Sequence, residues 1–179
     1  MAAYIKPVAL DTDTFASFGT VLETDQKHSY SINEGTTNRY HRLAISEALP
    51  APLASEATRG LPAQTILSIF EGKPYPIPVH LWMFERHPLG SQAFMPIDGN
   101  PWLVVVSDAV MPSDASRIWA FIARGDQGVS YFPGIWHHPL IALKRPSRFL
   151  VVDRDGPGIN LDEVRLRERV IITSDLLEE

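Results

Sequence analysis

The 179-residue chain contains no cysteine, so disulfide bonds and thiolate chemistry are excluded. It has no apolar run of the roughly 18 or more residues that a membrane-spanning helix needs, and its first residues lack the features of a secretory signal. Its 16 Lys and Arg residues are scattered and outnumbered by 21 Asp and Glu residues, which argues against a basic surface for nucleic acid or anionic lipid. These absences predict a cytoplasmic protein that binds neither nucleic acid nor membrane.

Proline is abundant, with 15 copies that separate short apolar runs. Because proline interrupts helices and is confined to strand ends and edges, this pattern favours many short strands joined by turns. Eight candidate strands are rich in β-branched and aromatic residues and cover residues 64–71, 79–87, 92–95, 103–107, 118–123, 129–132, 149–153 and 170–173. Two short helices are expected, one capped by Thr12 or Asp13 and ended by Gly19, the other over residues 161–169. The sequence contains no internal repeat or linker, so these elements predict a single mainly β domain over residues 1–179.

The most informative stretch is the predicted strand over residues 79–87, Val-His-Leu-Trp-Met-Phe-Glu-Arg-His. Side chains alternate across a strand, so Glu85 and His87 share one face with three apolar side chains before them. A carboxylate and an imidazole at the end of an apolar face can converge inside the mouth of a barrel. The alternative is that both mark the point where the strand reaches solvent, because Glu is seldom buried unless it is paired.

The downstream spacing favours the converging arrangement. Glu85-x-His87-x4-Gln92-x6-Gly99 follows His-x-His-x3–4-Glu-x6-Gly, the first motif of the cupin superfamily, with Glu in place of the first His and Gln in place of the Glu. The segment Gly128-Val-Ser-Tyr-Phe-Pro-Gly-Ile-Trp-His137 resembles the second cupin motif, in which a Pro-Gly turn presents a histidine. It is one residue shorter than that motif and lacks the following Asn. Together the motifs predict a double-stranded β-helix (jelly-roll) barrel with a few short helices.

Four residues of these motifs keep atoms that can bind a metal, namely Glu85, His87, Gln92 and His137. Two nitrogens and two oxygens with open positions suit nickel, manganese, iron(II) or zinc, and the sequence does not choose among these metals. The alternative is that no metal binds and that Glu85, His87 and His137 act directly as acid and base. His138 follows His137 in an extended segment, so the two are expected to face opposite ways.

Three segments also carry a resemblance to a known family. They are Ile-Asn-Glu-Gly-Thr-Thr-Asn-Arg-Tyr at residues 32–40, Phe-Glu-Arg-His-Pro-Leu-Gly-Ser-Gln-Ala-Phe-Met-Pro at residues 84–96, and Tyr-Phe-Pro-Gly-Ile-Trp-His-His-Pro-Leu at residues 131–140. The chain resembles the ureidoglycolate lyases of allantoin degradation, formerly called ureidoglycolate hydrolases, from about residue 7 to residue 176. The resemblance implies release of urea from (S)-ureidoglycolate to leave glyoxylate, a homodimer, and a divalent metal such as nickel.

The chemistry of that substrate is compatible with the candidate residues. Ureidoglycolate carries a carboxylate, a hydroxyl and a ureido group on one carbon, so the enzyme must bind an anion, deprotonate the hydroxyl and protonate the leaving urea nitrogen. His137 or Glu85 is the candidate base, and His87 or His137 is the candidate acid. The sequence does not assign the two roles uniquely.

Further candidates lie outside the two motifs or beside them. Arg39 is expected to bind the substrate carboxylate, because guanidinium and carboxylate pair in a planar fork. Asn33, in the same loop, is a candidate for the hydroxyl or the urea amide, and Trp136 is a candidate wall of the pocket. Asp153, at the end of a late strand, is expected either to orient a site histidine or to pair with a neighbouring arginine.

Two other kinds of function fit the same barrel. One is another metal-dependent cupin enzyme, a dioxygenase or isomerase that acts on a small 2-hydroxy or 2-oxo acid, and the other is a non-catalytic cupin that binds a small molecule. Oxygen chemistry usually uses His-rich iron sites, so Glu85 and Gln92 weaken the dioxygenase reading. The four ligand-capable residues and the Arg39 loop count against the non-catalytic reading.

Overall fold

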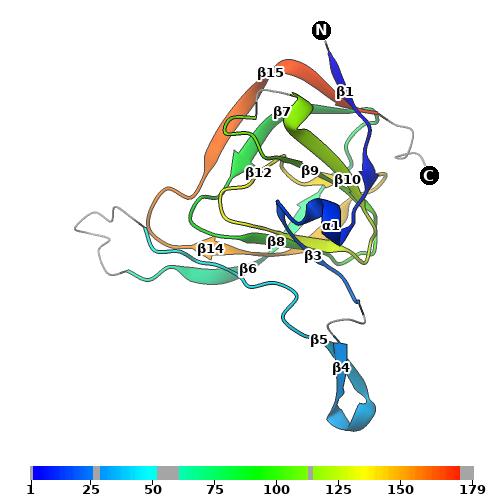
Figure 1. Ribbon diagram of the computed structural model, residues 1–179, viewed down its shortest axis with the longest axis vertical. Coiled ribbons are helices and arrows are strands. Elements are labelled where there is room, and N and C mark those ends of the chain that lie inside the picture. The colour runs from blue at the N-terminus through cyan, green and yellow to red at the C-terminus, as the bar shows by residue number, and fades with distance from the viewer. Residues whose placement is uncertain (1, 26–28, 52–60, 113–114, 174–179) are drawn as a thin grey trace.

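The computed structural model describes residues 2–25, 29–51, 61–112 and 115–173, and its two main sheets curl around a shared interior (Figure 1). The eight-stranded sheet has the order β1 (Ala3–Ile5), β15 (Asp162–Ile172), β7 (Val79–Arg86), β12 (Trp136–His137), β9 (Trp102–Ser107), β10 (Ile118–Ala123) and β2 (Val8–Ala9), with β13 (Ile141–Ala142) also paired to β9. The five-stranded sheet has the order β3 (Gly19–Leu22), β11 (Gly128–Tyr131), β8 (Gln92–Pro96), β14 (Ser147–Asp155) and β6 (Gln64–Gly72). This mainly β architecture confirms the predicted cupin-type barrel.

All eight predicted strands are present; the ends of seven differ by at most two residues, and the last, predicted over residues 170–173, is the end of the longer strand β15. The predicted helix over residues 161–169 is wrong, because these residues form most of strand β15. Exposure alternates along the start of this strand, where Val164 and Leu166 pack against a hydrophobic cluster. Antiparallel pairing with β7 supplies the backbone hydrogen bonds that a helix would otherwise satisfy internally.

Short helices are few, as predicted, and only α1 (Thr12–Phe15) of the described elements is an α-helix. Its N-cap is Asp11 rather than Thr12 or Asp13, because the backbone of Asp11 is extended and its carboxylate accepts hydrogen bonds from the amides of Asp13 and Thr14. The helix places Phe15 in the barrel interior, where the side chain is fully buried. Two 3-10 helices, η2 (Asn33–Gly35) and η3 (Ala115–Arg117), complete the helical elements described.

Aromatic and β-branched side chains from both sheets fill the barrel interior. Strand β9 is buried on both faces: Val104 and Val106 belong to the interior cluster, whereas Leu103 and Val105 pack in a second cluster. The interior cluster also contains Tyr131, whose ring contacts His137. The aromatic core therefore packs directly against the candidate site.

One part of the chain stands apart from the barrel. Strands β4 (Ser29–Ile32) and β5 (Thr37–Tyr40) form a two-stranded sheet that pairs with neither main sheet within the described residues. We call residues 29–40 the arm, and Figure 1 shows it projecting away from the barrel. No helix in the described ranges is long and apolar enough to span a membrane.

Candidate functional site

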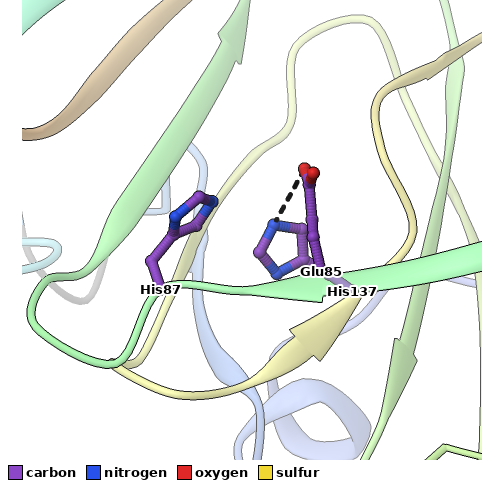
Figure 2. A group of neighbouring side chains, drawn as sticks. All are labelled: Glu85, His87 and His137. Carbon is purple, nitrogen blue, oxygen red and sulfur yellow. Dashed lines mark ion pairs between the residues drawn. The ribbon is translucent and has the colours of Figure 1, made fainter. Parts of the chain in front are cut away.

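Glu85, His87 and His137 come together in the structure, as Figure 2 shows. Glu85 on β7 and His137 on β12 are direct partners in the antiparallel register, and His87 follows the last residue of β7. Each residue offers a ligand atom, and these atoms all lie within 4.8 Å of one another. Oε1 of Glu85 is 3.7 Å from Nε2 of His137. The structure therefore assembles three of the four predicted ligands.

Backbone carbonyls fix the tautomer of both histidines. Nδ1 of His87 lies 2.8 Å from the carbonyl oxygen of Asn160, and Nδ1 of His137 lies 3.0 Å from that of Ile135. Because a carbonyl only accepts, each Nδ1 carries the proton and each Nε2 keeps a free lone pair. Both Nε2 atoms are buried and have no hydrogen-bond partner among the described residues. This arrangement is the one that orients metal-binding histidines.

Gln92 approaches the cluster from the opposite sheet. On strand β8 it pairs with Tyr131 of β11, and the Tyr131 ring stacks on the His137 imidazole at 4.3 Å between centroids with an interplanar angle of 10°. This contact shows that the β8–β11 row faces the β7–β12 row. The buried Oε1 of Gln92 also has no hydrogen-bond partner in the described part of the chain. The role of Gln92 as the fourth ligand stays a prediction.

The electrostatics of the cluster follow from its burial. Burial raises the pKa of Glu85, with Glu163 adding to the rise and His87 opposing it. Burial, with a smaller contribution from the neighbouring His87, lowers the pKa of His137 to about 3. His137 is therefore neutral at physiological pH, as a metal ligand or a proton acceptor must be. Two neutral imidazoles, a carboxylate and an amide oxygen form a donor set that could hold a divalent metal.

The structure does not bring the other predicted site residues into this cluster. Arg39 and Asn33 lie on the arm, where the Arg39 guanidinium is 6.0 Å from the Tyr30 ring centroid and Asn33 contacts Thr37. Trp136 precedes His137 on β12 and packs in the second core cluster, away from the side on which His137 meets Tyr131. The substrate-binding roles of Arg39, Asn33 and Trp136 stay predictions.

Two residues that lie against the site were not predicted from the sequence, namely Tyr131 and Asn160. Tyr131 packs on His137. The backbone carbonyl of Asn160 accepts a hydrogen bond from His87 Nδ1, and its side-chain Oδ1 accepts one from the backbone amide of Leu89. For Asp153 the sequence allows two roles, and its spacing from the apolar residues before it places it on the inward face of its strand.

The fold and the cluster define a cupin with a candidate mononuclear metal centre. The family model described as ureidoglycolate lyase matches residues 2–173. The chain is 49% identical over 149 residues to the ureidoglycolate lyase of Rhizobium etli (strain CIAT 652), covering 83% of each chain. It is 44% identical over 169 residues to that of Pseudomonas syringae pv. syringae (strain B728a), covering 93% of this chain and 92% of the relative. The chain therefore belongs to the ureidoglycolate lyase family, which confirms the predicted resemblance.

Removing either histidine should weaken metal binding. In protein freed of metal by chelation, His87→Gln and His137→Gln should each lower the affinity for Ni²⁺ or Mn²⁺ by more than about tenfold, since even loss of an outer partner costs about 10- to 100-fold. Isothermal titration calorimetry measures this. His80→Gln is the matched control, because His80 lies on the same strand β7 but is exposed. Affinities that match the unmodified protein in both variants would contradict the metal assignment.

His138 gives the fold a separate pH dependence. It lies among the rings of Tyr75, Trp82 and Phe84, and burial lowers its pKa to about 4, against a hydrogen bond to the Pro139 carbonyl that raises it. In the unfolded chain the pKa of histidine is about 6.5. Between these values the unfolded state binds the extra proton, so this contribution to stability is complete above about pH 6.5 and is lost as the pH falls towards about 4.

The free energy of unfolding of metal-free His138→Gln should therefore fall less steeply between these pH values. The difference from the unmodified protein should approach about 1.4 kcal/mol per pH unit. Urea unfolding at several pH values measures it. The exposed-site variant His80→Gln should keep the unmodified slope, and equal slopes for His138→Gln and the unmodified protein would refute the assignment.

Proposed function

We propose that this chain cleaves (S)-ureidoglycolate into glyoxylate and urea, within the breakdown of allantoin and purine nitrogen. The observation that carries the proposal is the Glu85–His87–His137 cluster, whose two free imidazole nitrogens are buried in a chain of the ureidoglycolate lyase family. Its relatives at 44% to 49% identity carry the name ureidoglycolate lyase. The cytoplasmic location stays a prediction from the sequence.

The reaction needs two proton movements at one carbon. The hydroxyl loses its proton and becomes the aldehyde of glyoxylate, while the carbon–nitrogen bond breaks and the leaving nitrogen of urea gains a proton. His137 and Glu85 are the candidate bases, and His87 and His137 are the candidate acids. Burial keeps His137 unprotonated, and burial raises the pKa of Glu85, which makes its carboxylate a stronger proton acceptor.

A divalent metal, with nickel as our proposal, would be held by Glu85, His87, Gln92 and His137. When bound, it supplies a Lewis acid that lowers the pKa of the substrate hydroxyl and fixes its orientation. A histidine nitrogen engaged with the metal cannot carry a proton at the same time, so ligand and acid–base roles must divide among these residues.

Arg39 and Asn33 are proposed to bind the substrate carboxylate and its polar neighbours from the arm. A two-stranded hairpin on its own is marginally stable in water, and the described part of the arm pairs with neither main sheet. A homodimer in which the arm reaches the barrel of a second copy would give the hairpin a packing partner. It would also bring the Arg39 guanidinium to the substrate carboxylate, with which it can form two parallel hydrogen bonds.

Arg39→Lys should raise the KM for ureidoglycolate by about tenfold with a smaller change in kcat, because lysine keeps the charge but lacks the planar fork. Steady-state kinetics measures this, with Arg42→Lys as the control on an exposed arginine three residues later. Unchanged kinetics for Arg39→Lys would reject this role.

Light scattering should give the mass of two chains, and a fully active monomer would contradict the proposed contact between copies.

The reaction itself is tested by assaying glyoxylate, urea and ammonia together during incubation with racemic ureidoglycolate. We expect equal amounts of glyoxylate and urea above the uncatalysed rate, no ammonia, loss of activity with EDTA and recovery with Ni²⁺ or Mn²⁺. His137→Ala should reduce kcat by at least about a hundredfold, the scale of general acid–base catalysis, whereas His80→Ala should not. Ammonia in place of urea, or no turnover with added metal, would overturn the proposed function.

A further inference from the structure

Asp153 lies on the interior face of strand β14, at the end of the barrel that holds the cluster. Phe149 and Val151, the preceding residues on that face, are fully buried in the interior cluster. In the register, Val152 pairs with Ala93 of β8, which places Asp153 opposite Gln92. Tyr131, Gln92 and Asp153 thus form a row across β11, β8 and β14.

This row faces the Glu85–His87–His137 cluster. Tyr131 stacks on His137, and Gln92 is placed beside it in the register. Burial raises the pKa of Asp153, and a hydrogen bond from Gln92 and the proximity of His87 oppose that rise. Asp153 therefore lies near both the Gln92 amide and the His87 imidazole.

The two arginines that could neutralise Asp153 are engaged elsewhere. Arg154 donates to the carbonyl oxygens of Leu49, Gly156 and Pro157, and Arg148 pairs with Asp98 at 2.6 Å. Oδ1 of Asp153 is buried and has no hydrogen-bond partner in the described structure. A buried carboxylate oxygen left in this state is an acceptor that a ligand can satisfy.

Asp153 does not belong to the group of residues whose ligand atoms lie within 4.8 Å of one another, which consists of Glu85, His87 and His137. Its free oxygen is therefore a separate acceptor beside the candidate metal centre. The three polar groups of ureidoglycolate differ in what they offer to it: the carboxylate would repel Asp153, and the hydroxyl must release its proton at the cluster. The ureido group presents three N–H donors, which are the complement of a carboxylate.

We propose that Asp153 binds the ureido group of the substrate, with Oδ1 accepting hydrogen bonds from the ureido N–H groups. This assignment rests on the proposed function and extends it. The ureido end then points towards the five-stranded sheet while the hydroxyl faces Glu85, His87 and His137. The carbon–nitrogen bond to be cleaved lies between the two, and an acid that lacks the ureido group leaves Asp153 unpaired.

Two ligands separate this role from a general effect on the site. N-carbamoylglycine is the substrate without its hydroxyl and keeps the ureido group, whereas glycolate keeps the hydroxyl and carboxylate and lacks the ureido group. In nickel-loaded protein studied by calorimetry, Asp153→Asn should weaken N-carbamoylglycine binding by at least about tenfold, the scale of a lost hydrogen bond to a charged group. Glycolate binding and nickel content should stay within about twofold. Asp155→Asn, at an exposed carboxylate two residues later on β14, should change neither.

Three results would overturn the role of Asp153: equal weakening of both ligands, unchanged N-carbamoylglycine binding, or no N-carbamoylglycine binding by the unmodified protein. Retained glycolate binding in Asp153→Asn also shows that the variant is folded. The two proposals fail separately. Absence of urea release by the unmodified protein overturns the proposed function, whereas a urea-releasing protein in which Asp153→Asn binds N-carbamoylglycine normally overturns only the assignment of Asp153.

Discussion

The stacking of the Tyr131 ring on the His137 imidazole joins the two sheets of the barrel at the candidate site. Tyr131 belongs to the aromatic core of the interior, so the position of His137 depends on the packing of that core. Register then places the remaining groups: Glu85 is fixed by pairing with His137, and Gln92 by pairing with Tyr131. A single interior contact thus relates the polar groups of one sheet to those of the other.

Burial gives the site its chemical character. Polar atoms in protein interiors are nearly always hydrogen-bonded, yet His87 Nε2, Gln92 Oε1, His137 Nε2 and Asp153 Oδ1 are buried without partners within the described ranges. The backbone carbonyls of Asn160 and Ile135 hold the two rings so that these free nitrogens are acceptors. All four atoms can accept a hydrogen bond or donate a lone pair to a metal. The arrangement therefore suits a metal ion together with a ligand that carries N–H donors, such as a ureido acid.

Alternation along the chain was enough to predict most strands and the shared face of Glu85 and His87, because each depends only on neighbouring residues. The many charges of residues 161–169 suggest a surface helix and obscure the alternation in which Val164 and Leu166 face inwards. The functions of Tyr131 and Asp153 depend on which strands are adjacent, and the sheet order β3–β11–β8–β14–β6 is not encoded in any local pattern. Arg39 lies on the projecting arm, so its role cannot be derived from the barrel of one copy.

The central claim is that Glu85, His87 and His137 hold a divalent metal between the two sheets, where the substrate is cleaved. Anomalous diffraction at the nickel absorption edge, from crystals grown with nickel and glycolate, tests it most directly. The account predicts an anomalous peak bounded by the Glu85 carboxylate and the Nε2 atoms of both histidines, with glycolate density beside it. A nickel peak elsewhere, or an empty cluster in crystals that bind nickel at other positions, would contradict it.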